Sequence, residues 1–325
     1  EGSSGGIQLP MGTTGLSIWV RPSRPFNQVI LAAKIRDSQG QYANFAFGYT
    51  VQREDQVERR FTLNFNEWKR LETTFSEDSV FSSGRRRFGS TYMAPPFTLE
   101  AIFVTFQDSR EAGAVYLDDL VALTGLQHHE EPLYDFQSSA GWHVVEDYSS
   151  PGLYSLEVSE SVVREGRSRS SAFFWPAGGL GAVGIRPGPP EQPLPAIVSQ
   201  SLLDRAEASV GDQLLVNISG TAIPVRVAGV VDFFPTLFPS NAPFAIMDAH
   251  SLLAFMNLRT VRLPQTVNEL WVKLDPQGMG SDGFARVLQG HGVRISGVTL
   301  ASDVVQNRLS HPMLSAGWSG LLSLS

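Results

Sequence analysis

Short stretches of alternating apolar and polar residues fill the first third of the chain and constrain its fold most. Leu16–Val20, Val29–Ile35 and Tyr42–Phe47 are of this kind, and Pro, Gly, Asp or Asn separates them. Similar stretches follow at Arg59–Leu63, Trp68–Phe75, Phe97–Phe106 and Ala114–Leu123. No segment of helical spacing interrupts them. Roughly seven short strands over roughly 110 residues predict a β-sandwich, which we place at residues 1–127.

Composition excludes several classes of protein. The chain has 325 residues, enough for two or three domains, and a net charge of −7. Nucleic-acid binding needs a basic surface, so no nucleic-acid partner is expected. The chain has no cysteine, which excludes disulfides, thiol nucleophiles and thiolate metal sites.

Residues 128–192 form a second β-like region that ends in a linker. Tyr134–Gln137, Gly141–Val144, Leu153–Val158 and Ser168–Trp175 are expected strands, and the Gly/Pro-rich stretch 178–195 is an expected extended connector. These strands either complete the first sandwich or form an incomplete second one.

From residue 193 to residue 310 the pattern is mixed α and β. The apolar spacing predicts helices at Ile197–Ala208, Ala249–Leu258 (with Asp248 as N-cap), Ser281–Gln289 and Leu300–Leu309. Strands are expected at Leu214–Ile218, Ile223–Val231, Phe244–Met247, Glu269–Leu274 and Val293–Leu300. Residues 311–325 are small, apolar and uncharged after His311. They are typical of the start of a membrane helix, with a helix packed on the domain as the alternative.

Two resemblances suggest a function. The Leu16–Val20 strand, Trp68–Leu71 and the strand that contains Asp118 and Asp119 resemble jelly rolls of the carbohydrate-binding-module type, which are galactose-binding-like sandwiches. Residues 193–318 are similar to the periplasmic core domain of FtsX/MacB-type ABC transporter permeases. That similarity rests on Gly211-Asp212, Val225–Val231, the following Phe-Phe-Pro-Thr and the helix after Asp248.

The resemblance implies an extracytoplasmic, non-catalytic part of a permease that is anchored in the membrane. Its partners would be the membrane helices of the same permease, a separate ATPase subunit, and a protein or glycan outside the cell. The alternative is a secreted or surface carbohydrate-binding protein. A hydrolase with a lectin-like appendage is a third hypothesis, but no spacing of acids singles out a catalytic pair.

Motifs for catalysis and cofactor binding are absent from the sequence. No phosphate-binding loop, nucleophile elbow, HExxH helix or dinucleotide fingerprint is present, so we expect no enzyme activity and no organic cofactor. His128-His129-Glu130-Glu131 is the one metal-like cluster, and adjacent histidines on an extended chain point apart. The same alternation is expected to separate Asp118 from Asp119. One of the two is a candidate ligand for Ca²⁺, with a conformational role as the alternative.

Aromatic residues give the candidate contact surfaces. Trp19, Trp68 and Tyr116 lie in strong strand patterns and are expected in the core, whereas Tyr42, Phe45, Tyr49 and Tyr92 are expected at a surface. Among these, Tyr42 and Tyr92 are candidate contact residues. The apolar loop with Phe233, Phe234, Leu237 and Phe238 is a further candidate partner surface, with a loop folded onto its own core as the alternative.

Overall fold

The computed structural model describes residues 5–53, 56–75, 93–106, 111–178, 183–234, 237, 242–260, 265, 281–290 and 298. The chain divides into two compact units, Glu1–Thr266 and Val267–Ser325. In the second unit, helix α3 (Ser281–Gly290) confirms the expected helix. The strand expected at Glu269–Leu274, the helix at Leu300–Leu309 and the apolar tail 311–325 lie outside the described residues. So does the strand expected at Val293–Leu300, apart from Val298.

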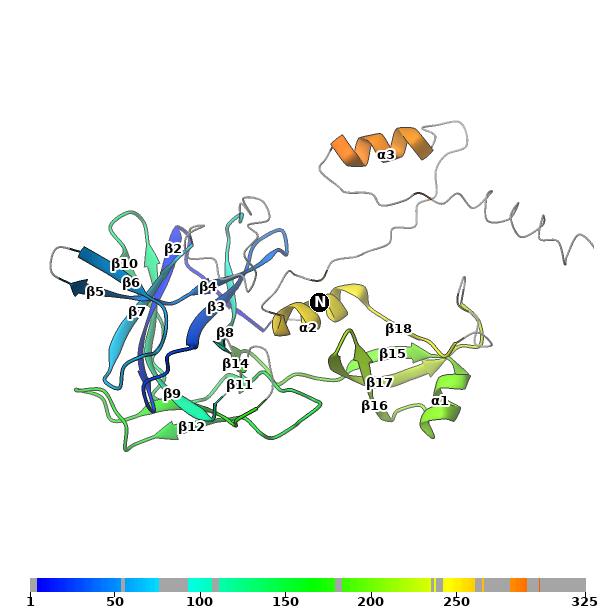
Figure 1. The fold of residues 1–325 in the computed structure, drawn as a ribbon. Coiled ribbons are helices and arrows are strands. Elements are labelled where there is room, and N and C mark those ends of the chain that lie inside the picture. Colours follow the sequence, from blue (N-terminus) through cyan, green and yellow to red (C-terminus); the bar gives the residue numbers. More distant parts are fainter. Residues whose placement is uncertain are drawn as a thin grey trace, which may run out of the picture. The chain divides into compact units, whose positions relative to one another are not determined.

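The first unit begins with two six-stranded antiparallel sheets (Figure 1). Sheet A runs in the order β11 (Trp142–Val144), β14 (Val183–Pro187), β8 (Thr98–Phe106), β3 (Val29–Arg36) and β4 (Tyr42–Ala46), and β1 (Ile7–Gln8) also pairs with β8. Sheet B runs in the order β12 (Ser155–Ser159), β13 (Ser170–Trp175), β9 (Gly113–Thr124), β2 (Thr13–Pro22) and β7 (Lys69–Thr74), and β10 (His129–Tyr134) also pairs with β9. A separate hairpin joins β5 (Tyr49–Arg53) to β6 (Gln56–Arg60).

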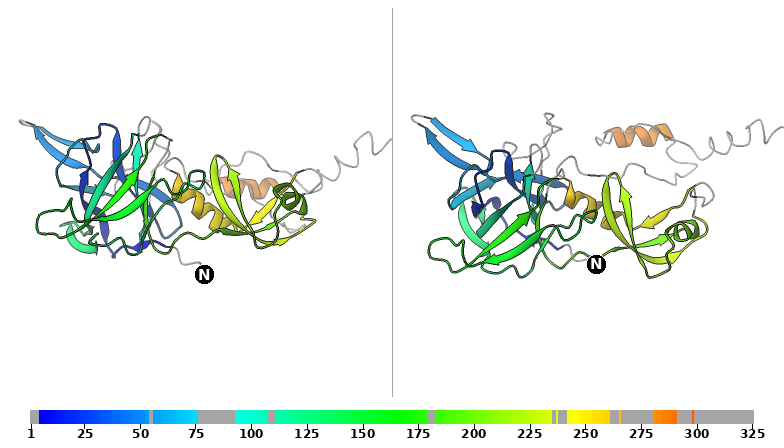
Figure 2. Two further views of the ribbon diagram at one scale, coloured as in Figure 1. Left: turned by 90° about the horizontal axis from the view of Figure 1, so that it is seen from below. Right: turned by 60° about the horizontal axis from the view of Figure 1, so that its bottom comes forward.

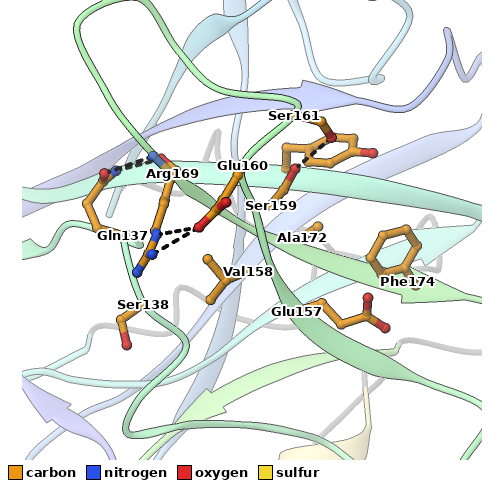
Figure 3. A pocket seen from close by; sticks show the side chains of 11 residues that line it. Gln137, Ser138, Glu157, Val158, Ser159, Glu160, Ser161, Arg169, Ala172 and Phe174 are labelled. Carbon is orange, nitrogen blue, oxygen red and sulfur yellow. Dashed lines mark hydrogen bonds and ion pairs between the residues drawn. The ribbon is translucent and has the colours of Figure 1, made fainter.

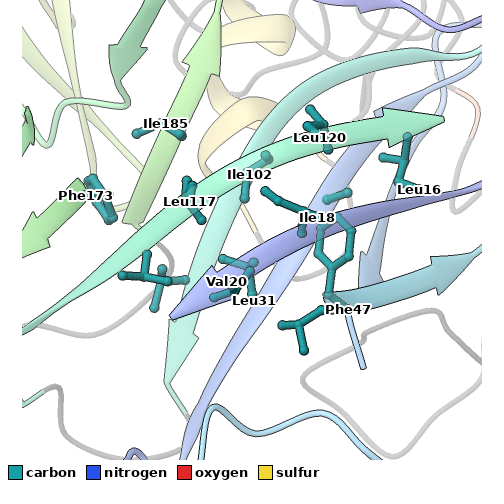
Figure 4. Packing of buried hydrophobic residues seen from close by; sticks show 14 of the residues in the cluster. Leu16, Ile18, Val20, Leu31, Phe47, Ile102, Leu117, Leu120, Phe173 and Ile185 are labelled. Atoms are coloured by element: carbon teal, nitrogen blue, oxygen red, sulfur yellow. The ribbon is translucent and has the colours of Figure 1, made fainter. Parts of the chain in front are cut away.

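Apolar side chains from both sheets fill the space between them (Figure 4). Every second residue of β2 points inward, namely Leu16, Ile18 and Val20, and none of the three is exposed to solvent. Leu117 and Phe173 meet them from β9 and β13 of the same sheet. The alternation predicted from the sequence therefore builds a sandwich core.

Residues 128–187 supply strands to both sheets. β12 and β13 extend sheet B beyond β9, while β11 and β14 extend sheet A beyond β8. This is the arrangement of a segment that completes the first sandwich. The expectation of an unpacked connector over 178–195 is wrong at β14, where Val183 and Ile185 enter the core. A Cβ at Gly184 would lie 2.1 Å from the Ile102 carbonyl oxygen, so this glycine permits close strand contact rather than a loose linker.

The small module, residues 194–260, follows the sandwich. Its sheet has the order β16 (Gln213–Ile218), β17 (Thr221–Val230), β15 (Leu194–Val198) and β18 (Ala245–Met247), and β15 runs parallel to β17. The expected β16–β17 hairpin is confirmed. So is the helix α2 (Ala249–Arg259), whose N-cap Asp248 accepts a hydrogen bond from the Ser251 backbone N–H at 2.7 Å.

One helix of the small module was predicted too long. The helix expected over Ile197–Ala208 is instead the end of β15 followed by the short helix α1 (Gln200–Ala206). Ala196 and Val198 are buried among apolar residues of β17, and this long-range pairing overrides the local helical spacing.

The C-terminal end of helix α2 packs on the outer face of sheet A. Phe103 and Ala101 of β8 point away from the sandwich core and form a separate apolar cluster with Leu258 of α2 and Val145. On the neighbouring strand β3, the outward Lys34 contacts the end of α2. We call this surface the covered face; the two views in Figure 2 show α2 (yellow) between the sandwich strands and the small sheet.

Candidate functional site

The outer face of sheet B has no such helix upon it in the part of the chain that the structure describes. Its side chains come from adjacent strands: Trp19 of β2, Tyr116, Asp118 and Asp119 of β9, and Phe174 of β13. We call this surface the open face. Two hollows lie on it, and polar, charged and aromatic side chains line both.

A β-bulge places both aspartates on the open face. Three steps along β9, from Val121 to Asp118, pair with two steps along β2, from Ser17 to Trp19. Asp119 takes a φ of +39° at this extra residue. Because a bulge breaks the two-residue alternation, the expectation that Asp118 and Asp119 face opposite ways is wrong.

Two arginines bind these aspartates from a distant loop. The Arg164 Nε donates to Asp118 Oδ2 at 3.1 Å, and the other end of its guanidinium donates to Asp119. Arg167 also donates to Asp119, and its Nε lies 3.8 Å from Asp118 Oδ1. The Arg164 guanidinium lies 4.8 Å from the ring centroid of Trp19. Two carboxylates, two guanidiniums and a tryptophan thus fix the loop between β12 and β13 against the sheet.

The aspartates differ in burial. Asp118 is not exposed to solvent at all, whereas the side chain of Asp119 is 24% exposed. Burial raises the pKa of the Asp118 carboxyl above its ordinary value, and the hydrogen bond from Arg164 opposes that rise. The cluster is therefore a partly buried ion-pair network in which two guanidiniums face two carboxylates.

This donor set does not fit Ca²⁺. Calcium takes six to eight oxygen ligands, and both candidate carboxylates, Asp118 and Asp119, are already bound by guanidiniums that a cation would have to displace. No group of three or more His, Asp or Glu side chains within the described ranges is placed to hold a metal, which includes the residues of His128-His129-Glu130-Glu131. The arrangement supports the conformational role for this pair.

The first hollow has a volume of about 710 Å³ and lies at the β12–β13 end of the open face (Figure 3). Tyr116 and Phe174 form its aromatic wall, with ring centroids 6.4 Å apart and planes at 79°. Gln137 and Arg169 lie across the hollow, where Arg169 pairs with Glu160. The lining is completed by Glu157, by two apolar residues and by three serines: Val158, Ala172, Ser138, Ser159 and Ser161.

The second hollow, of about 630 Å³, lies at the β2–β7 end. Trp19 and Tyr134 line it together with Asp119 and Arg167 of the ion-pair cluster. Arg70 adds a further ion pair with Glu130 at 2.6 Å. The loop between β12 and β13 contributes residues to both hollows, so its anchoring shapes the whole open face. In chemical terms the face can stack planar groups and exchange hydrogen bonds with hydroxyls or charged groups.

The placement of the aromatic residues corrects the sequence expectation in both directions. Trp19, Trp68 and Tyr116 are only half-buried, so their assignment to the core is wrong. Phe45 and Tyr49, expected at a surface, are 3% and 8% exposed and lie in the core, because Phe45 packs against Phe75 and Tyr49 against Phe65. Tyr42 is half-buried beside Glu100, and its burial raises its pKa to about 12.

The apolar loop after β17 is exposed where it is described. Phe233 is 59% exposed, Phe234 41% and Leu237 37%, and Phe234 and Leu237 form an isolated bridge with one another. Phe238 and Tyr92 lie outside the described residues. Phe233, Phe234 and Leu237 line neither hollow of the open face, and the role of this loop as a partner surface stays a prediction.

Sequence reasoning missed Arg164, Arg167, Gln137 and Phe174. Phe174 follows the inward-facing Phe173 in an alternating strand, which could have placed it outside. No local signal joins Arg164 to Asp119, since 45 residues separate them.

No family model, curated protein or solved structure matches this chain significantly. In the described part of the chain, no helix combines the length and the apolar character needed to cross a membrane.

Proposed function

We propose that this chain is the extracytoplasmic, non-catalytic part of an ABC-type permease. In this proposal the sandwich recognises a ligand or partner through its open face. The small module passes movement toward the membrane helices, which a separate ATPase subunit drives. The jelly-roll assignment of the sandwich and the FtsX/MacB-like assignment of the small module belong to this proposal.

The contrast between the two outer faces of the sandwich carries the proposal. Leu258 and Arg259 of α2 contact the sandwich at the covered face. Because of these contacts, a displacement of one module would move the other. The open face keeps two lined hollows for recognition. This division of tasks suits a module that binds on one side and transmits on the other. It adds to the resemblance of residues 193–318 to permease core domains.

Labelling in intact cells tests the proposal. Because these 325 residues have no cysteine, single cysteines introduced into the complete gene product at Met11 and Val210, which are 75% and 58% exposed, are the only targets in this part of it, and the parent protein gives the background labelling. We expect a membrane-impermeant maleimide to label both from outside the cell, and an ATPase subunit to co-purify with the product. Leu16→Cys, at a buried position, is the unlabelled control. Labelling only after lysis would reject the proposal.

Carbohydrate recognition is the second candidate function, favoured by the first hollow. An aromatic wall of Tyr116 and Phe174 next to hydroxyl, amide and carboxylate groups suits a sugar ring, which presents both an apolar face and hydroxyls. A glycan array followed by titration calorimetry tests it. Tyr116→Ala and Phe174→Ala should each weaken binding about tenfold, equivalent to about 1.4 kcal/mol. Val57→Ala, an exposed change elsewhere, should have no effect. Silence on the array would remove this candidate.

A further inference from the structure

Lys34 lies at the contact between the sandwich and the small module. It projects from β3 on the covered face and is 1% exposed. Its Nζ donates to the Asn257 carbonyl oxygen at 2.6 Å and to the Thr260 carbonyl oxygen. The Phe103 ring centroid lies 5.3 Å from the same nitrogen. A buried amine thus bridges a strand of the sandwich and a helix of the small module.

The two acceptors belong to the end of α2. Asn257 lies in its last turn and Thr260 is its C-cap residue. The last carbonyls of a helix have no partner within the helix, and the helix end carries partial negative charge. Lys34 therefore both satisfies the end of α2 and joins it to the sandwich.

The charged groups around Lys34 are paired with one another. Glu100 of β8 attracts Lys34 but is bound to Arg36 at 2.6 Å. On the side of α2, Arg259 is bound to Glu191, which Arg186 approaches at 3.7 Å. No ion pair found among the described residues includes Lys34.

The two carbonyl acceptors are enough for an uncharged amine. A neutral amine donates two hydrogen bonds and an ammonium three, and two carbonyls receive them here. Burial lowers the pKa of Lys34 from 10.5 to about 7, and Glu100 opposes the shift. The two acceptors accommodate the neutral amine, and burial lowers the affinity of Lys34 for its third proton when the contact is closed.

We propose that Lys34 makes the contact between the sandwich and α2 sensitive to pH, with acidification weakening the contact and rising pH strengthening it. This inference goes beyond the proposed function and does not depend on it. A permease module, a glycan-binding protein or any other protein with this contact would respond in the same way.

The direction follows from proton linkage. When the contact opens, Lys34 enters water and binds its proton with the ordinary pKa of 10.5, against about 7 when the contact is closed. The open state binds more protons between these two values, so the closed state gains up to about tenfold in population per pH unit as the pH rises through this window. Below about pH 7 and above pH 10.5, the ratio of the closed to the open state no longer depends on the protonation of Lys34.

Two tyrosines near the contact do not titrate in this window. Burial raises the pKa values of Tyr42 and Tyr148 to about 12, so both stay neutral. The remaining charged groups around the contact are carboxylates and guanidiniums: Arg36, Glu100, Glu146, Arg186, Glu191 and Arg259.

Distance measurement on the full chain tests the inference. Dyes on cysteines introduced at Met11 and Val210 report the separation of the sandwich and the small module, because no native cysteine competes. The urea dependence of this separation gives an opening constant at each pH. We expect the constant to fall by up to about tenfold per pH unit above pH 7. Lys34→Met, which removes the charge, should make it independent of pH in this window, as should Lys34→Arg, which keeps the charge.

A direct titration completes the test. The chain has three lysines, so the ¹⁵N signal that disappears in Lys34→Met identifies Lys34. A midpoint near 7 supports the inference, and a midpoint near 10.5 overturns it. An opening constant that changes by less than about twofold across the window, or a pH dependence retained in Lys34→Met, would also overturn it.

Discussion

The two outer faces of the sandwich are built from the same kind of strand but differ in what they expose. On the covered face, Ala101 and Phe103 are buried against Leu258 of α2. On the open face, Trp19, Tyr116 and Phe174 remain half-buried, and polar groups separate them. One sheet therefore has apolar residues on both sides, whereas the other has an apolar side and a mixed side.

This difference separates the two roles of the sandwich: the covered face holds the small module, and the open face is available to a ligand. A face that a helix covers contributes to stability, because its side chains lose contact with water. A face that stays accessible contributes little to stability and is available for a ligand. The following predictions break or sharpen this contrast.

The largest difference is expected for one phenylalanine on each face. Phe103→Ala on the covered face should lower the free energy of unfolding by about 3–5 kcal/mol, since the ring is 1% exposed. Phe174→Ala on the open face should lower it by about 1 kcal/mol, because the ring is already partly exposed to water. Urea unfolding of both variants measures the two losses. Equal losses would mean that the two faces do not differ as described.

Ion pairs should show the same contrast. Glu191, whose side chain is 9% exposed, binds Arg259 beside the covered face. Glu191→Gln should lower the free energy of unfolding by about 3 kcal/mol because Arg259 is left buried without its anion. Glu160 is 69% exposed on the open face. Glu160→Gln should cost about 0.5 kcal/mol or less, and a larger loss in urea unfolding would contradict a solvent-screened pair.

Loosening the loop between β12 and β13 tests what shapes the open face. Asp119→Asn weakens two contacts, to Arg164 and Arg167, and should make opening of the loop easier by about 1–2 kcal/mol. Trypsin should then cut at the loop arginines about 5–30 times faster, since cleavage follows the population of the open loop. Asp232→Asn, an exposed change in the small module, is the matched control. An unchanged cleavage rate in Asp119→Asn would show that the ion pairs do not hold the loop.

The smallest effect concerns the start of the helix that covers sheet A. Hydrogen bonds from Ser251 hold the pKa of Asp248 below its ordinary value of 3.8. The folded state therefore binds this proton less tightly than the unfolded state does. The stabilisation is fully present above 3.8 and is lost as the pH falls through the lower, folded-state pKa. Asp248→Asn should flatten this part of the stability–pH curve, measured by urea unfolding at several acidic pH values. An acid branch identical to that of the parent would reject the cap.

The sequence predicts local structure correctly where residues close together in the chain determine it. Asp248 caps the helix that its position predicts, and β16 and β17 pair as their alternation indicates. Errors arose where distant segments decide. The helical spacing after Ile197 gave way to pairing with β17, and the bulge at Asp119 reversed the expected direction of one aspartate. The apolar pattern of β2 predicts a buried Trp19, but only the alternate residues Leu16, Ile18 and Val20 face the core.

One signal for the covered face was present in the sequence. β3 reads Val-Ile-Leu-Ala-Ala-Lys-Ile, apolar at six of seven positions, as is typical of a strand buried on both sides. β2 keeps Ser17 and Arg21 at outward positions. Counting polar residues at the outward positions of each strand would have separated the two faces, although it would not have identified α2 as the cover.

The sequence by itself determined the strand-rich character, the capped helix and the absence of cysteine chemistry. Each of these depends on residue type and on spacing along a few turns or strands. Only the tertiary structure decided that residues 128–187 complete the sandwich, that Arg164 meets Asp118 and Asp119, and that α2 covers one face and leaves the other open. The physical reason is that alternation records whether a side is buried, whereas the segment that buries it is selected by contacts among residues far apart in the chain.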